Sequence, residues 1–180
     1  YLQNQMMIAD KWAVQVGVRY DDSQNKTHNT TTGAKTKVDN EEWTTNFGVA
    51  YLMDSGFTPY ASYAQSFNPI IQLDQNGNPA KPERGEQFEV GLKYQPRSFD
   101  GYFNIAAFEV AKENLAREVD GQITQIGEVR NRGIELEAVA NVTEALTLIG
   151  NVSFIDSEIT EDANSSYVGN TPSQIADQLA

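Results

Sequence analysis

Apolar and polar residues alternate with a period of two along several stretches of this chain. In the clearest stretch, aromatic and branched side chains recur at every second position from Trp12 to Tyr20, with Gln15 and Gly17 among the residues between them. Successive side chains of a β-strand point to opposite faces, so this period predicts a strand with one apolar and one polar face. Four further stretches alternate in the same way: 43–53, 88–94, 134–140 and 146–154.

Two other segments predict strands with a less regular pattern. Residues 57–67 are rich in Tyr and Ser, and the charged side chains of Glu109, Lys112 and Glu113 interrupt the alternation within residues 102–119. A β-bulge would account for this interruption. The chain therefore predicts an all-β antiparallel fold of about seven strands, with the beginning of an eighth near its C-terminal end.

Short and long connections alternate between the predicted strands. The short ones are residues 54–56, 95–101 and 141–146, and the long ones are residues 21–42, 68–84 and 161 onward. Outer-membrane β-barrels have this arrangement, with short periplasmic turns and longer external loops. A soluble β-sandwich would share the alternation of side chains but gives no reason for the alternation of loop lengths. Within the first long connection, we expect residues 21–36 to form a mobile loop.

Composition narrows the class of protein further. Only 39% of residues are hydrophobic, the mean hydropathy is −0.50, and no run approaches the ~20 apolar residues that a membrane-spanning helix needs. Barrel strands tolerate such values because half of their side chains are polar, and an aromatic content of 10% suits the girdles of a barrel. The net charge of −12 argues against a nucleic-acid partner.

Candidate chemistry is sparse. The chain has no cysteine and its one histidine, His28, lies in a polar segment, so no His-centred triad or thiolate metal site can be assembled. Asp156 and Glu158 form a carboxylate pair, but nothing marks a cleft around them. Residues 74–78 resemble the start of a calcium loop without its final acidic ligand, and an Asn-Gly turn explains them more simply. We therefore predict no enzyme, no catalytic residue, no metal site and no bound cofactor.

Four segments follow one another in an order typical of one family. Residues 60–69 read YASYAQSFNP, residues 81–94 read KPERGEQFEVGLKY, residues 127–137 read GEVRNRGIELE and residues 167–172 read YVGNTP. In their residues and their spacing, these segments resemble the barrel of TonB-dependent siderophore receptors, in particular the ferric hydroxamate-type receptors. Asn131 replaces the small hydroxyl residue usual in the third segment, and residues 17–21 (GVRYD) resemble a strand end of the same family.

The resemblance implies a fold, a location and a function. Such receptors form a transmembrane barrel of about 22 strands in the bacterial outer membrane, in contact with its lipid and plugged by an N-terminal domain. They bind ferric siderophores as transported ligands and import them with energy from the TonB-ExbB-ExbD system. Neither a plug nor a TonB box is recognisable in this sequence. We therefore expect residues 1–180 to be part of a barrel domain whose parent protein performs the transport.

Two sets of residues are candidates for a functional role. Arg130, Arg132, Glu135 and Glu137 are expected to lie on one face as a ladder of charges in the lumen or as contacts to the plug. Tyr63 and Phe67, near the outer ends of strands, are candidates for binding the siderophore. Aromatic residues at such positions also serve as girdle anchors at the membrane interface.

Two other functions are compatible with the same pattern. The chain could belong to a smaller outer-membrane barrel that acts as an adhesin or structural protein, or to a soluble β-sandwich that binds a ligand. A longer parent gene with an upstream plug would separate the receptor from the small barrel. A sandwich would stay monomeric in plain buffer, whereas an open strip of barrel would aggregate through its unpaired edges.

Overall fold

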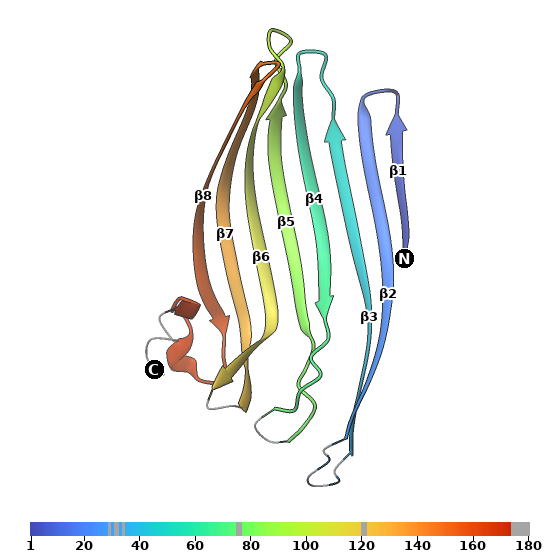
Figure 1. The fold of residues 1–180 in the computed structure, drawn as a ribbon, viewed down its shortest axis with the longest axis vertical. Coiled ribbons are helices and arrows are strands. Elements are labelled where there is room, and N and C mark those ends of the chain that lie inside the picture. Colours follow the sequence, from blue (N-terminus) through green and yellow to red (C-terminus); the bar gives the residue numbers. More distant parts are fainter. Residues whose placement is uncertain (29, 31–32, 34, 75–76, 120–121, 174–180) are drawn as a thin grey trace.

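Eight strands form one antiparallel sheet, and their order in the sheet is their order in the sequence (Figure 1). The computed structural model describes residues 1–28, 30, 33, 35–74, 77–119 and 122–173. The elements are β1 Leu2–Ile8, β2 Trp12–His28, β3 Lys35–Tyr51, β4 Phe57–Asn68, β5 Glu83–Tyr94, β6 Gly101–Val119, β7 Gln122–Thr143, β8 Leu146–Glu161 and the short 3-10 helix η1 Ser165–Tyr167. The expected all-β antiparallel fold is confirmed.

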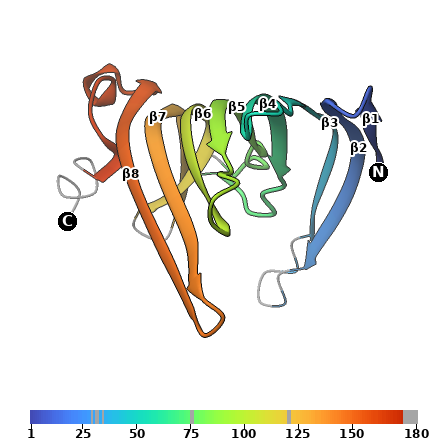
Figure 2. The same ribbon diagram turned by 90° about the horizontal axis from the view of Figure 1, so that it is seen from above.

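The sheet is a curved, open strip. Figure 2 shows it as an arc with β1 and β8 at its two ends. Each of these strands pairs with one neighbour within the described chain, β1 with β2 and β8 with β7. Both therefore present an edge of unpaired backbone groups, which is the arrangement expected of a segment cut from a closed barrel wall.

The pleat gives the sheet two chemically different faces. Residues directly opposite each other in an antiparallel pair share a face, and the register places Tyr20 opposite Trp43, Tyr63 opposite Phe88 and Ile134 opposite Phe154. These side chains form an apolar face that stays exposed: Phe154 is 66%, Trp43 63% and Phe88 60% accessible. In water, each would forgo about 1.5–3 kcal/mol of burial free energy. Lipid contact removes that cost.

The short turns lie together at one end of the sheet, the upper end in Figure 1, as the sequence predicts. They join β1 to β2, β3 to β4, β5 to β6 and β7 to β8. Gly56 lies in the second turn at a φ of 91°, a left-handed conformation that glycine adopts without strain. Aromatic pairs on the apolar face lie near this end: Trp12 with Tyr51 and Phe57 with Tyr94, at centroid distances of 4.6 and 4.4 Å.

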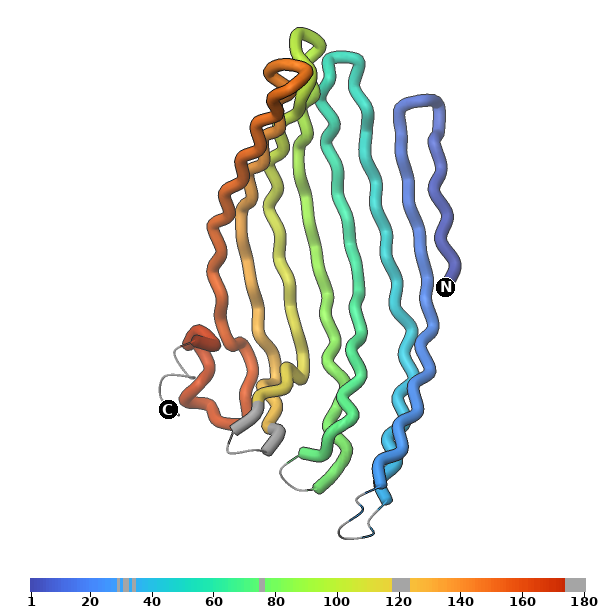
Figure 3. Tube along the Cα trace, in the orientation of Figure 1, coloured from blue at the N-terminus to red at the C-terminus, as the bar shows by residue number. Residues whose placement is uncertain are grey.

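The prediction of a mobile loop at residues 21–36 is wrong for most of that range. β2 and β3 continue as a paired hairpin to His28 and Lys35, past the end of β4 (Figure 3). Thr, Asn and Lys side chains hide this pairing from an apolar-polar pattern, because one face of the projecting hairpin is exposed and the other buries only a few side chains, Val38 and Asn40 among them. The backbone ladder alone continues the strands, and its hydrogen bonds do not depend on side-chain polarity.

The described structure has one strand that the sequence analysis did not predict. It is β1, whose residues LQNQMMI break the alternation and so escape prediction. After β8 the chain folds back, and Gly169 N donates to Ile159 O at 2.9 Å. The strand expected beyond Pro172 falls largely on residues 174–180, outside the described part of the chain.

No register shift accompanies the irregular pattern of β6. Its pairing with β5 and β7 is continuous from Phe103 to Glu113, so the bulge expected there is wrong for this stretch. The charged residues interrupt the alternation because they lie in the part of β6 far from the short turns, past the last apolar residues of the exposed face. One residue farther on, Asn114 adopts a left-handed φ of 56°.

Candidate functional site

The polar face carries a connected group of side chains on β4, β5 and β6. Tyr60 Oη donates a hydrogen bond to Glu89 Oε1 at 2.8 Å, and Asn104 Nδ2 donates to Tyr60 Oη at 3.2 Å. The Asn104 Oδ1 atom is buried without a hydrogen-bond partner in the described structure. Three neighbouring strands are thus tied together by a partly buried network that leaves one acceptor available.

Two glycines make room for this network and its surroundings. A Cβ at Gly91 would overlap the Tyr60 ring, and a Cβ at Gly133 would overlap the ring of Phe108. In each case the aromatic ring can approach the neighbouring strand this closely because the glycine has no side chain. Glycine within a strand is otherwise unfavourable, and here it marks a close approach.

A second group continues the polar face toward β7 and β8. Tyr102 Oη donates to Glu137 Oε1 at 3.0 Å, and Lys93 Nζ lies 4.1 Å from the centroid of the Tyr102 ring. Ser153 Oγ donates to Glu135 Oε1 at 3.4 Å. Together with Glu89, the two carboxylates give this part of the polar face three negative charges and one lysine. It is suited to contact a cationic or hydrogen-bond-donating surface.

The structure divides the four charged residues expected on one face. Glu135 and Glu137 lie opposite Ser153 and Asn151 on the polar face. Arg130 and Arg132 lie in phase with Ile134, on the other face. Side chains at every second position of a strand share a face. Arg132 and Glu135 are three positions apart, so they point to opposite faces. The expectation that the arginines face Glu135 and Glu137 is therefore wrong.

The arginines instead pair with carboxylates on their own face. Arg132 Nε lies 2.5 Å from Glu109 Oε2, and Arg130 Nη2 lies 2.8 Å from Glu128 Oε1. Exposure of the Arg132 side chain is 59%, so its pair is a surface ion pair worth about 0–1 kcal/mol. These charges lie beyond the apolar residues along β6 and β7, at the level where a lipid face would give way to water.

Tyr63 and Phe67 also lie on the apolar side of the sheet. Tyr63 lies opposite Phe88 with ring centroids 5.6 Å apart, and its hydroxyl donates to Glu86 Oε1 at 3.0 Å. Phe67 lies opposite Arg84 in the same alternating phase. An aromatic ring with a polar tip at the end of an apolar band is typical of an interface anchor. The placement favours this role, and siderophore contact by either residue stays a prediction.

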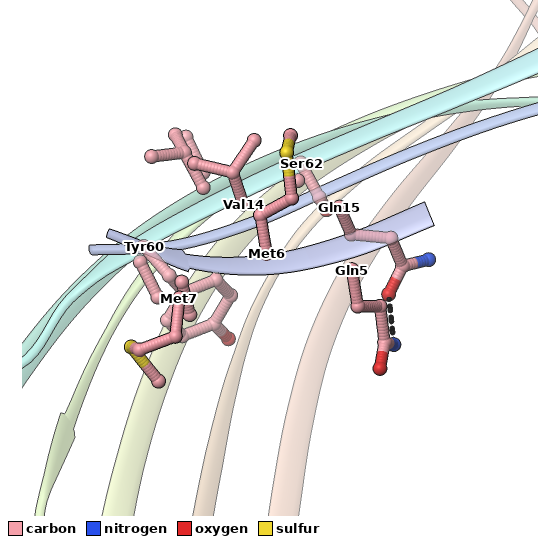
Figure 4. A pocket seen from close by; sticks show the side chains of 12 residues that line it. Gln5, Met6, Met7, Val14, Gln15, Tyr60 and Ser62 are labelled. Atoms are coloured by element: carbon pink, nitrogen blue, oxygen red, sulfur yellow. Dashed lines mark hydrogen bonds between the residues drawn. The ribbon is translucent and has the colours of Figure 1, made fainter. Parts of the chain in front are cut away.

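A hollow of about 580 Å³ lies beside β1, β2, β3 and β4. Figure 4 shows Met7 and Tyr60 on one side of the sheet and Met6 and Val14 on the other, with the side-chain amides of Gln5 and Gln15 joined by a 2.9 Å hydrogen bond. Because its lining comes from both faces, the hollow is a gap near the open edge at β1. It does not define an enclosed site.

Hydrogen bonds connect the loop between β4 and β5 to the outer end of the β6–β7 hairpin, that is, the end opposite the short turns. Gln125 Nε2 donates to Lys81 O at 2.7 Å and to Asn114 O at 2.9 Å, while Lys81 N donates to Gln125 Oε1 at 3.0 Å. Ala116 N donates to Glu83 Oε1 at 2.9 Å. These contacts hold two segments that are far apart in the sequence in one arrangement.

A small apolar cluster joins the β6–β7 hairpin to β8 and to the segment that follows β8. Ile126, Val129 and Ile159 are buried, and Tyr167 of η1 packs against them. The Arg117 guanidinium carbon lies 5.6 Å from the centroid of the Tyr167 ring. The outer end of β6 and β7 is therefore held by the β4–β5 loop and by the segment after β8.

The polar-face residues Tyr60, Tyr102 and Asn104 were not identified from the sequence. Counting alternate positions along the strand would have placed Tyr60 on the polar face. It lies two positions from Ser62 and therefore on the same face, whereas Ala61 and Tyr63 lie on the opposite one. No sequence signal marks the contact of Gln125 with Lys81, since the two residues meet only through the folding of separate loops. Glutamine side chains at strand ends are common and carry no pattern of their own.

The two ends of the calcium-like segment, Asp74 and Asn78, hydrogen-bond to each other, and residues 75 and 76 lie outside the described part of the chain. Asp74 N donates to Asn78 O at 2.7 Å and Asn78 N donates to Asp74 Oδ1 at 2.8 Å, with Gly77 at a φ of 78°. Within the described residues, no three His, Asp or Glu side chains gather as ligands for a metal ion. In the same part of the chain, no helix has the length and apolar character needed to cross a membrane.

Comparison with known proteins agrees with this two-faced sheet. The family model described as TonB dependent receptor-like, beta-barrel, matches residues 1–180. The ferrichrome outer membrane transporter/phage receptor of Escherichia coli K12 is 37% identical over 183 aligned residues, covering 100% of this chain and 24% of that protein. The ferrioxamine B receptor of Salmonella typhimurium LT2 is 32% identical, with coverages of 87% and 22%.

Solved structures confirm the fold. The siderophore receptor PiuA from Acinetobacter baumannii superimposes with a TM-score of 0.74 at 22% identity, over 94% of this chain and 28% of that one. The alcaligin receptor FauA from Bordetella pertussis gives 0.69 at 22% identity, over 93% and 30%. The chain spans about a quarter of the length of the curated relatives it matches. It belongs to the TonB-dependent receptor β-barrel family, whose members lie in the bacterial outer membrane.

Proposed function

We propose that this chain is part of the barrel wall of an outer-membrane receptor that binds ferric siderophores and imports them with energy from TonB. The observation that carries the proposal is the family match over residues 1–180 together with relatives named for ferrichrome and ferrioxamine B. The sheet supports it, because an exposed apolar face suits lipid and an acidic, hydrogen-bonding face suits a lumen. Energy coupling through TonB-ExbB-ExbD belongs to the parent protein.

Glu135 and Glu137 have a more specific place in this proposal. On the polar face they join Glu89 in a carboxylate group that one lysine, Lys93, only partly balances. A plug inside the barrel would meet this face and could supply arginine or lysine side chains to it. The arginines of β7 take no part in that contact, because they lie on the opposite face.

No catalytic role is proposed. The matching family and relatives are described as receptors and transporters. The expectations that the chain is not an enzyme and binds no resident cofactor stay predictions, and the ferric siderophore enters as cargo.

Growth on defined iron sources tests the function. A strain lacking the full-length gene is starved of iron and supplied in turn with different ferric siderophores, beside its parent and a strain with the gene restored. We expect selective failure on one chelate and recovery with the restored gene. Equal growth of all three strains on every chelate would contradict siderophore import and would favour another nutrient or a structural barrel.

A further inference from the structure

One arginine at the outer end of the sheet differs from the others in its electrostatic partners. Within the described structure, four arginines pair with a carboxylate: Arg19, Arg84, Arg130 and Arg132. Arg97 donates to the Asp54 carbonyl. Arg117 has neither kind of partner among the described residues, and its Nε and Nη1 atoms are buried without any hydrogen-bond acceptor. In a chain of net charge −12, this is an unbalanced cation.

The surroundings of Arg117 fix the guanidinium in place. It lies 5.6 Å from the centre of the Tyr167 ring, which comes from the segment after β8 and packs on the cluster of Ile126 and Ile159. A cation is attracted to the face of an aromatic ring, more strongly when water is excluded. The ring satisfies part of the charge but accepts no in-plane hydrogen bond from the guanidinium nitrogens.

The backbone beside Arg117 is fixed as well. Asn114, with its left-handed φ of 56°, accepts from Gln125 through its carbonyl and donates from its side chain to Pro82 O at 3.1 Å. Thr124 Oγ1 donates to Arg117 O at 3.2 Å. A ligand that binds here meets a cation whose support is already ordered, which lowers the entropic cost of binding.

We propose that Arg117 is an anion-binding site that selects an anionic ferric chelate, one carrying a free carboxylate, as cargo. The identity of the cargo as a ferric chelate rests on the proposed function; the anion site itself does not. Buried donors without an acceptor mark a place where a ligand, ion or water belongs, and the planar guanidinium matches two carboxylate oxygens. The hairpin lies at the end of the sheet opposite the short turns, where external loops receive a ligand (Figure 1).

Binding of two ferric complexes by the detergent-solubilised full-length receptor tests the selection. The probes are ferric citrate, which is anionic, and a neutral ferric trihydroxamate. For Arg117→Gln we expect affinity for ferric citrate to fall about tenfold or more, while that for the neutral complex changes less than about twofold. Arg117→Lys keeps the charge and should lose less. The matched control is Arg97→Gln, in a short turn at the opposite end of the sheet.

Equal losses for both complexes, or no loss for either, would overturn the proposal. A wild-type receptor that binds neither complex would count against the proposed function alone, and a chemical probe then decides the site. Isothermal titration calorimetry compares the binding of inorganic phosphate by the wild-type, Arg117→Gln and Arg97→Gln receptors. Loss of phosphate binding in Arg117→Gln but not in Arg97→Gln supports the anion site, and equal binding by all three overturns it.

Discussion

At the scale of single residues, phase along a strand decides which side chains can meet. Arg132 and Glu135 are close in sequence and opposite in charge, yet the pleat sends them to different faces. Tyr60 and Tyr63 are divided in the same way: Tyr60 joins the polar network, and Tyr63 packs against Phe88 in a tilted ring pair. Residue type alone would have placed both tyrosines in one aromatic group.

Gly91 provides a test of the close approach over the polar face. Substitution by valine places a branched side chain where the Tyr60 ring lies, so the ring must move and its hydrogen bond to Glu89 is lost. We expect Gly91→Val to destabilise the folded barrel by about 1–3 kcal/mol. Thermal unfolding of the full-length protein in detergent, followed by loss of the compact band on unheated gels, measures this.

The matched control is Gly150→Val on β8. A Cβ there meets no atom within 4 Å, and the position lies opposite Ala138 on the apolar face. Valine at residue 150 should leave the unfolding temperature nearly unchanged. Equal destabilisation by the two substitutions would show that the strand tolerates no side-chain change, and that the Tyr60 contact is not the cause.

At the scale of elements, the short turns are joined to one another across the end of the sheet. Lys11 Nζ of the β1–β2 turn lies 2.9 Å from Asp54 Oδ2 of the β3–β4 turn. Asn141 Nδ2, at the end of β7, donates to Asp100 Oδ2 of the β5–β6 turn at 2.7 Å. Each contact joins two consecutive hairpins at the end of the sheet that carries the short turns, across the paired strands β2 and β3 or β6 and β7.

The Lys11–Asp54 pair predicts an acid-dependent contribution to stability. The hydrogen bond and charge of Lys11 hold the pKa of Asp54 below its usual 3.8. A lowered carboxyl pKa stabilises the folded state above pH 3.8, and this contribution is lost as the pH falls through the folded-state value. The pKa of Lys11 is raised above 10.5 by the same partner, so the contribution persists into the alkaline range.

Asp54→Asn in the full-length protein should therefore lower the unfolding temperature slightly at pH 7, and this difference from wild type should shrink as the pH falls below 3.8. Because Asp54 is 83% exposed, high salt should also reduce the difference. Asp10→Asn, a change of the same kind in the β1–β2 turn, serves as the control. A difference that stays constant from pH 7 to well below pH 3.8 would contradict the ion pair.

At the scale of the whole molecule, the sheet is stable only in a particular solvent. Its apolar face is exposed and its two outer strands have unpaired edges, so few side chains are buried. Membrane lipid would cover the apolar face, and further strands would close the edges. The isolated strip lacks both.

We therefore expect residues 1–180, produced alone, to aggregate in plain buffer and to remain dispersed only in detergent. Exposed edges add strands from neighbouring copies, and apolar faces associate in water. Analytical ultracentrifugation with and without detergent measures this, beside a soluble β-sandwich of similar size as control. A monodisperse, folded monomer in plain buffer would contradict the barrel-wall interpretation.

Much of the fold could be predicted because alternation is a local signal. The strands with apolar residues at every second position, such as 12–20 and 88–94, were identified from the pattern. β1 and the outer halves of β2 and β3 were not, because the residues of β1 break the alternation and those of the outer halves of β2 and β3 are mostly polar. Of the candidate site, Glu135 and Glu137 were predicted on the polar face, whereas the arginines were placed on the wrong one.

The sequence by itself determined the strand class, the two-faced sheet, the short turns and the family. Each of these depends on residues near one another in the chain, whose periodicity or motifs can be read directly from the sequence. Only the tertiary structure decided that Tyr60 meets Glu89 and Asn104, that Gln125 holds Lys81, and that Arg117 lies against Tyr167 without a carboxylate. These contacts join distant segments through strand register and loop packing, and no local pattern encodes them.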